Sequence, residues 1–138
     1  MSHFRPVTDY FAVSGQLSPI DVAAARAEGF TLIIDNRPDG EAPGQATAGE
    51  IAAAAEQEGL AFRHIPVVGL PPPGSEESAA VSEAIAESGG KTLAYCRTGT
   101  RSIALWALGE LAAGQKSRDE LLRIAADAGY DLAGVLPH

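Results

Sequence analysis

Short runs of apolar residues alternate along the chain with longer stretches in which apolar positions recur at helical spacing. The short runs predict four strands, at residues 10–13, 30–34, 60–68 and 92–95. The longer stretches predict five helices, at residues 18–28, 47–59, 75–88 and 101–113 and from residue 117 onward. The final residues, 130–138, are predicted to be irregular or to form one helical turn.

Capping signals mark where several of these helices begin and end. Ser18 and Pro19 are typical of an N-cap followed by the first helical position, and Gly29 is typical of the residue that ends a helix. Thr47 and Glu50 have the spacing of a capping box, in which each side chain bonds the backbone N–H of the other residue. The helix boundaries are therefore predicted by local chemistry as well as by periodicity.

Alternation of strands and helices indicates an α/β fold with a small, mostly parallel central sheet and helices on both faces. We find no repeat, low-complexity tract or linker, so residues 1–138 are predicted to form a single domain. In such sheets, ligands bind beyond the carboxyl ends of the strands. Polar residues that directly follow a predicted strand are thus the first candidates for chemistry.

Composition and charge narrow the classes of function. The chain is 46% hydrophobic and 20% charged, as in an ordinary soluble globular protein. No apolar segment is long enough to span a membrane, and residues 1–6 do not resemble a signal peptide, so a cytoplasmic protein is expected. The single cysteine fits a reducing compartment. A net charge of −8 argues against nucleic acid or an anionic membrane as a partner.

The only cysteine, Cys96, stands where a predicted strand gives way to a loop and a helix, in the sequence Tyr-Cys-Arg-Thr-Gly-Thr-Arg-Ser of residues 95–102. The backbone N–H groups and dipole of a helix N-terminus bind anions and stabilise a thiolate. Cys96 is therefore the predicted nucleophile, and Arg101 is the predicted ligand-binding arginine because its planar guanidinium can hold two oxygens of an anion. The remaining predicted anion-binding residues of this loop are Arg97, Thr98, Gly99, Thr100 and Ser102.

Two of these residues have an alternative role. Arg97 can equally be a solvated surface charge. Ser102 is expected to donate a hydrogen bond to the Cys96 thiolate, the alternative being that it caps the helix. Trp106, on the following helix, is expected to be a core residue.

A second polar segment follows the strand predicted at 30–34, and its side chains are expected at the rim of the same pocket. These rim residues are Asp35, Arg37 and Asp39. Arg37 is expected to pair with one of the two aspartates as loop scaffolding, and a role for either aspartate as a general acid is the alternative. His64 is expected to be a packed or edge histidine. No residues stand at metal-ligand spacing, so neither a metal site nor a cofactor is predicted.

The loop at 96–102 resembles the active-site loops of cysteine-dependent phosphatases and of rhodanese-type sulfurtransferases. The wider chain resembles the phosphatase-like domain of the beta-lactamase hydrolase-like proteins, a bacterial family with the dual-specificity-phosphatase fold. The supporting segments are residues 14–18, 34–41, 64–67 and 129–132. The resemblance implies this fold and a reactive Cys96, and its members have been described both as phosphatases and as sulfur transferases.

The sequence departs from the phosphatase pattern at two points. Four residues separate Cys96 from Arg101, whereas phosphatase loops have five and rhodanese-like loops have four. Dual-specificity phosphatases also carry an aspartate general acid on the loop that precedes the cysteine strand, and residues 68–77 contain no aspartate. An alkoxide leaving group needs a proton, whereas sulfite or a thiolate leaves without one.

These departures favour a rhodanese-like sulfurtransferase. In this hypothesis sulfane sulfur from thiosulfate or a low-molecular-weight persulfide passes through a Cys96 persulfide to a thiol acceptor or cyanide. The alternative is a phosphatase that forms a Cys96 phosphocysteine, and a second alternative is a redox- or anion-sensing module. The expected partners are a small anionic substrate and a thiol acceptor, with a functional link to a metallo-hydrolase or a sulfur-oxidising enzyme.

Overall fold

The computed structural model describes residues 3–138, which form one five-stranded sheet and five helices. The strands are β1 (Arg5–Thr8), β2 (Phe11–Ser14), β3 (Phe30–Asp35), β4 (Ala61–His64) and β5 (Lys91–Tyr95). The helices are α1 (Pro19–Ala27), α2 (Ala48–Glu58), α3 (Glu76–Ser88), α4 (Thr100–Ala112) and α5 (Arg118–Asp127). All five predicted helices and all four predicted strands are present.

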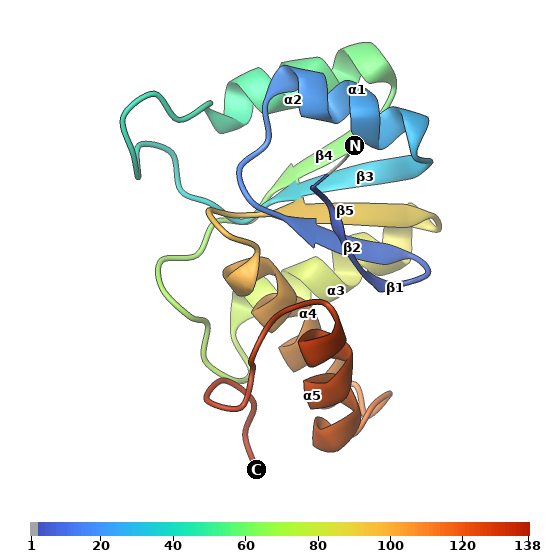
Figure 1. Ribbon diagram of the computed structural model, residues 1–138, viewed down its shortest axis with the longest axis vertical. Helices are drawn as coiled ribbons and strands as arrows, with labels where there is room; N and C mark the ends of the chain where they lie inside the picture. Colours follow the sequence, from blue (N-terminus) through green and yellow to red (C-terminus); the bar gives the residue numbers. More distant parts are fainter. Residues whose placement is uncertain (1–2) are drawn as a thin grey trace.

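The sheet has the order β1-β2-β5-β3-β4, and every pairing is parallel except that of β1 with β2. Helices α1 and α2 cover one face, while α3, α4 and α5 lie on the other (Figure 1). The predicted α/β class, with a mostly parallel sheet and helices on both faces, is confirmed. Among the described residues, no helix is both long enough and apolar enough to cross a membrane.

Strand β1 is the element that the hydrophobic pattern missed. Its four residues, Arg5 to Thr8, include a proline and have no buried member. Proline is tolerated on an edge strand because its missing N–H can face away from the partner strand. The strand is held by antiparallel pairing with β2 and by long-range contacts, which its own composition does not reveal.

The strand predicted at residues 60–68 is shorter in the structure and ends at His64. Past this point the chain no longer pairs as a regular ladder, because Pro66 has no N–H to donate. Instead, the N–H of Ile65 donates to the carbonyl of Asp35 at 2.8 Å, and that of Val67 donates to the carbonyl of Asn36 at 3.1 Å. Residues 65–67 therefore lie alongside the loop that follows β3.

The helix starts follow the predicted caps. Two capping boxes are present, Ser18 with Asp21 and Thr47 with Glu50. In each, the side chain of one residue bonds the backbone N–H of the other. Helix α4 is the exception, because it begins after Gly99 with no side-chain cap. Its first N–H groups are thus left free of side-chain partners at the sheet edge where Cys96 lies.

Each face of the sheet carries its own hydrophobic core. On the α1/α2 face, Leu93 and Tyr95 of β5 pack with residues of both helices. On the opposite face, Ala94 packs against α4, which is buried from Ser102 to Gly109 and includes the predicted core residue Trp106. Parallel pairing brings the carboxyl ends of β2, β5, β3 and β4 to one edge of the sheet.

Candidate active site

Cys96 directly follows β5 and is anchored through its backbone. Its N–H donates to the carbonyl of Ser14 at 3.2 Å, and its side chain accepts a hydrogen bond from the N–H of Gly99, with 3.1 Å between N and Sγ. The residue is only 1% exposed. An N–H aimed at sulfur from the start of a 13-residue helix stabilises negative charge on that atom.

The loop around the sulfur is shaped by two close approaches. Gly99 has φ +95°, and a Cβ at this position would lie 2.2 Å from the hydroxyl of Tyr130. That hydroxyl donates to the carbonyl of Thr98 at 2.8 Å, so Tyr130 holds the loop from outside. At Gly15 a Cβ would stand 3.0 Å from the carbonyl oxygen of Arg97. Gly99 needs glycine for its positive φ and its close approach to Tyr130, and a side chain at position 15 would crowd the Arg97 carbonyl.

Arg101 is held in a single orientation. Its Nη1 donates to Glu41 Oε2 and to the carbonyl of Val67, and its Nη2 donates to Glu41 Oε1, each at 2.8 Å. These bonds use three of the five guanidinium N–H donors and leave the edge formed by Nε and the second Nη2 hydrogen. Hydrogen bonding to Glu41 is the largest cause that raises the pKa of Arg101, and the charge of Cys96 adds to it.

Glu41 is the residue that sets this orientation, and sequence reasoning missed it. The hydrogen bond from Arg101 lowers the pKa of Glu41 to about 2, with Arg37 contributing further. Arg37 Nε donates to Glu41 Oε1 at 2.9 Å, and its Nη1 donates to Gln16 at 3.0 Å. The carboxylate of Glu41 is thus ionised at neutral pH and bonded to two arginines, so it has no proton to donate to a leaving group.

The predicted partner of Arg37 was therefore wrong. Its guanidinium pairs with Glu41, and only its backbone N–H reaches an aspartate, donating to Asp35 Oδ1 at 2.8 Å. The Arg37 side chain is 5% exposed and bonds to Glu41, the partner of Arg101. The reason is geometric: residues 37–41 form a turn that brings Arg37 and Glu41 together.

Ser102 also has a different partner from the expected one. Its hydroxyl donates to Oδ1 of Asn36 at 2.8 Å, in a fully buried contact, and not to the Cys96 sulfur. Asn36 in turn donates its side-chain N–H to the carbonyl of Ile65 and its backbone N–H to that of Tyr95, both at 2.8 Å. Asn36 thereby joins the end of β5, which precedes Cys96, to α4, which carries Arg101, and to residues 65–67, whose Val67 carbonyl accepts a bond from Arg101.

The remaining predicted loop residues differ in exposure: Gly99 is buried and Thr100 is half-buried. Arg97 and Thr98 are exposed, and the hydroxyls of Thr98 and Thr100 lie 3.1 Å apart. Within residues 3–138, Arg97 has no ion-pair partner. An anion-binding role for Arg97, Thr98, Gly99 and Thr100 remains a prediction that this geometry permits.

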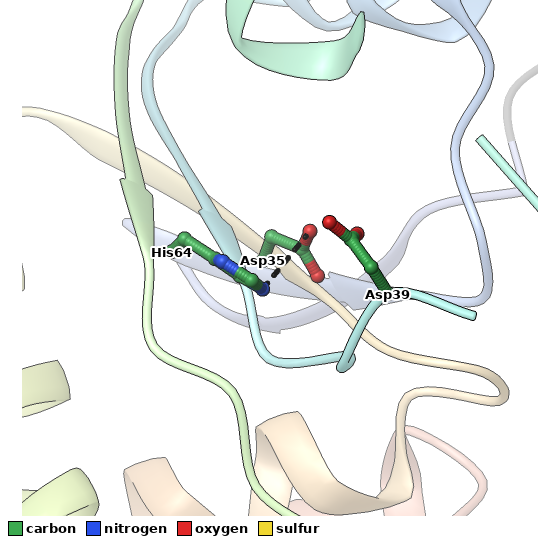
Figure 2. Close-up of side chains that lie close together, drawn as sticks. All are labelled: Asp35, Asp39 and His64. Carbon is green, nitrogen blue, oxygen red and sulfur yellow. Dashed lines mark ion pairs between the residues drawn. The ribbon is translucent and has the colours of Figure 1, made fainter. Parts of the chain in front are cut away.

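Asp35, Asp39 and His64 gather at the ends of β3 and β4 (Figure 2). Asp35 Oδ2 lies 3.7 Å from His64 Nε2, and burial raises the pKa of Asp35 while the N–H of Arg37 opposes that shift. Asp39 Oδ1 accepts from the N–H of Ala48 at 2.8 Å. Among the described residues, neither aspartate is hydrogen-bonded or ion-paired to loop 96–102. His64 ends an edge strand, as predicted.

The segment that holds the general acid in dual-specificity phosphatases supplies none here. The two acids of residues 68–77 are Glu76 and Glu77, and both lie in the first turn of α3. Acids in a first turn interact favourably with the helix dipole. Val67, just before this segment, contributes its carbonyl to Arg101. The site thus combines a thiol, an arginine and backbone N–H groups, and neither the ionised Glu41 nor residues 68–77 supply it with a proton donor.

Comparison with known proteins places this site in a family. The family model for the phosphatase-like domain of beta-lactamase hydrolase-like proteins matches residues 3–113. A beta-lactamase hydrolase-like protein from Xylella fastidiosa strain Temecula1 is 35% identical over 126 residues, which make up 91% of this chain and 29% of that protein. The chain therefore spans less than a third of the length of this relative.

Solved structures agree with this assignment. A candidate phosphatase from Neisseria meningitidis is 31% identical with a TM-score of 0.82, and the match covers 97% of this chain and 94% of that one. Tk-PTP in its active form, at 17% identity, matches with a TM-score of 0.70 over 99% and 88% of the two chains, and so shares the fold. The predicted dual-specificity-phosphatase-like fold is confirmed. The chain belongs to the family of phosphatase-like domains of beta-lactamase hydrolase-like proteins.

Proposed function

We propose that the chain is a cysteine-dependent phosphatase that moves the phosphoryl group of a phosphomonoester through Cys96 to water. The observation that carries this proposal is the orientation of Arg101. Glu41 and Val67 hold three of its N–H donors and leave two parallel donors on the remaining edge. Two parallel N–H groups match two oxygens of a phosphoryl group. The family description and the names of its structural relatives support the same chemistry.

The reaction follows from these groups in two steps. The Cys96 thiolate attacks phosphorus, so that an S–P bond forms while the ester P–O bond breaks and the leaving oxygen takes its proton from water. Water then attacks phosphorus, the S–P bond breaks, and inorganic phosphate leaves with the thiolate restored. The free edge of Arg101 and the N-terminus of α4 stabilise the charge on the phosphoryl oxygens in both steps.

The absence of an acid from the site restricts the substrate. Glu41 is ionised and bonded to arginine, and residues 68–77 contain no aspartate. A positioned general acid contributes roughly 10²–10⁴-fold when the leaving group is a poor one. Esters whose leaving group is stable as an anion, such as aryl phosphates, are therefore the substrates expected to react fastest.

A rhodanese-like sulfurtransferase is the second candidate, favoured by the four-residue spacing between Cys96 and Arg101 and by the same lack of an acid. In that reaction the thiolate attacks the outer sulfur of thiosulfate, a new S–S bond forms, and sulfite leaves with the electron pair of the old one. A thiol or cyanide then removes the sulfur from Cys96. Neither step needs a proton at the leaving group.

Parallel assays separate the two functions. Purified protein is tested for hydrolysis of an aryl phosphate and an alkyl phosphate, and for thiocyanate formation from thiosulfate and cyanide. The proposal expects turnover of the aryl ester, slower turnover of the alkyl ester, and loss of both in Cys96→Ser. Thiocyanate formation with no phosphate release would replace the proposal with the second candidate. Phosphate release that persists in Cys96→Ser would contradict both.

A further inference from the structure

Three metal-ligating side chains meet on the sheet edge beside the active site. One ligand atom from each of Asp35, Asp39 and His64 lies within 4.8 Å of the others. They come from the end of β3, the loop after it and the end of β4, and they point toward one another (Figure 2). Asp35 pairs in register with both His64 and Tyr95, and residues paired in this way project from the same face of a sheet. Tyr95 packs on the face that carries α1 and α2, so Asp35 and His64 project from that face too.

A buried hydroxyl beside this group has no hydrogen-bond partner. Tyr95 is 0% exposed, and its hydroxyl has no partner within hydrogen-bonding geometry. Asp35 and Gln16 are near enough to interact with it electrostatically, and burial is the largest cause that raises the pKa of Tyr95. Ser14, the next residue in the same cross-strand row, has a buried and unpartnered hydroxyl as well. Buried polar groups are nearly always satisfied by protein, water or an ion. The Tyr95 hydroxyl, next to Asp35 in this row, is therefore available to bond a ligand held by the carboxylates.

The two carboxylates are held in place but are not neutralised by a basic side chain of arginine or lysine. Backbone N–H groups bind one oxygen of each, from Arg37 to Asp35 and from Ala48 to Asp39, and the second oxygen of each has no backbone partner. Within the described chain, their only ion-pair contact is the one between Asp35 and His64.

Further oxygen atoms and an access route lie next to this group. The carbonyl oxygen of Arg37 lies 3.0 Å from His64 Nε2. Asp39 and His64 are both exposed, so the group can be reached from solvent. Two carboxylates and an imidazole, with a carbonyl oxygen nearby, are ligands that suit Zn²⁺ and Mn²⁺.

We propose that Asp35, Asp39 and His64 bind a divalent transition-metal ion, at a site distinct from the Cys96 loop. The bound ion joins the ends of β3 and β4 to the loop of residues 36–47, and an ion-bound water completes the bonding of the Tyr95 hydroxyl. Because the same loop carries Glu41, which orients Arg101, the ion stabilises the support of the active site without taking part in the reaction.

The test is a titration of chelator-treated protein with Zn²⁺ and, separately, with Mn²⁺, followed by calorimetry and thermal unfolding. The Cys96→Ser protein is used because a thiolate also binds Zn²⁺. One ion is expected to bind per chain and to raise the unfolding temperature. Asp39→Asn and His64→Gln are each expected to weaken binding by at least about tenfold, since even second-shell partners contribute that much. Both positions are exposed, so these variants are expected to fold.

Matched controls decide whether the binding belongs to this group. Asp127→Asn removes an exposed acid of α5, and the double variant His3→Gln, His138→Gln removes the other two histidines. Both controls are expected to retain full affinity. The proposal is overturned if neither ion binds at millimolar concentration, if Asp39→Asn and His64→Gln bind as tightly as their parent, or if the histidine double variant loses the ion.

Discussion

The two sides of the sheet's carboxyl edge are built differently. On the α4 side, the polar groups that support the Cys96 loop are paired: Ser102 with Asn36, Tyr130 with Thr98, and Glu41 with Arg101. On the α1/α2 side, the hydroxyls of Tyr95 and Ser14 are buried without partners. The first arrangement is complete in the absence of any ligand, so its geometry is fixed before substrate arrives. The second contains buried hydroxyls without partners, which is one reason why we infer a bound ion there in addition to the substrate on the α4 side.

Arg101→Lys, on the α4 side, is expected to have the largest effect on kcat/KM. A lysine ammonium has no planar fork, so it cannot hold Glu41 with two bonds and present two parallel donors to the substrate. Loss of such a donor typically costs about 10²–10³-fold in turnover, and this is the expected fall in kcat/KM. Arg63→Lys, in an exposed pair with Glu87, is the control and should leave kcat/KM unchanged. A loss in Arg101→Lys no greater than in this control would refute the assigned role.

Gly99→Ala is expected to have the next largest effect. Its Cβ would lie 2.2 Å from the Tyr130 hydroxyl, so either the loop or the Tyr130 ring that bonds it must shift. A displacement of about 1 Å near a reacting group can cost roughly 10²-fold in rate. Adding Tyr130→Phe should restore part of the activity by removing the clash. Gly114→Ala is the matched control, because Gly114 has φ +72° and a Cβ added there would meet no atom within 4 Å. Similar kinetics for both alanine variants would show that the Tyr130 contact does not shape the loop.

The contrast between the two sides predicts opposite outcomes for two serine substitutions. Ser102→Ala leaves Asn36 Oδ1 buried without its donor, which is expected to lower the free energy of unfolding by about 1–3 kcal/mol. Ser14→Ala removes a hydroxyl that has no partner, so metal-free protein should be unchanged or slightly more stable. Denaturant unfolding of both variants measures this difference. Equal losses of stability would mean that the two sides do not differ in the way described.

The smallest expected effect is a change in the acid sensitivity of stability. Glu41 has a pKa of about 2 in the folded protein against an ordinary value of 4.5, so it binds its proton less readily when folded. Its contribution to stability is therefore present above about pH 4.5 and is lost as the pH falls toward 2. Glu41→Gln should flatten the fall in unfolding temperature over that range. Glu87→Gln, which removes an exposed pair, should leave the slope unchanged.

Local chemistry made much of the fold predictable. The caps at Ser18 and Thr47 act within one helical turn, so the starts of α1 and α2 follow from a few neighbouring residues. The buried apolar run of β3 and the strand before Cys96 were equally clear. The edge strand β1 was not, because its pairing with β2 and not its composition holds it in place.

The site was predictable only in its contiguous part. Residues 96–102 lie together in sequence, so the thiol, the helix start and Arg101 could be found from their order. The supporting pairs connect distant segments: Glu41 and Arg101 are 60 positions apart, and Ser102 and Asn36 are 66 apart. Nothing in the local pattern of Glu41 or Asn36 specifies such partners. A search for metal-ligand spacing within one segment also misses Asp35, Asp39 and His64, because only the fold brings these three residues together.

The central claim, that Cys96 is the nucleophile for an anionic group held by Arg101, is tested most directly by trapping the covalent intermediate. The protein is mixed with an aryl phosphate, quenched within one turnover and examined by intact and peptide mass spectrometry. We predict the added mass of one phosphoryl group on the peptide that contains Cys96, and no such adduct in Cys96→Ser. Turnover of the ester with Cys96 unmodified at every quench time, or an adduct on another residue, would contradict the account.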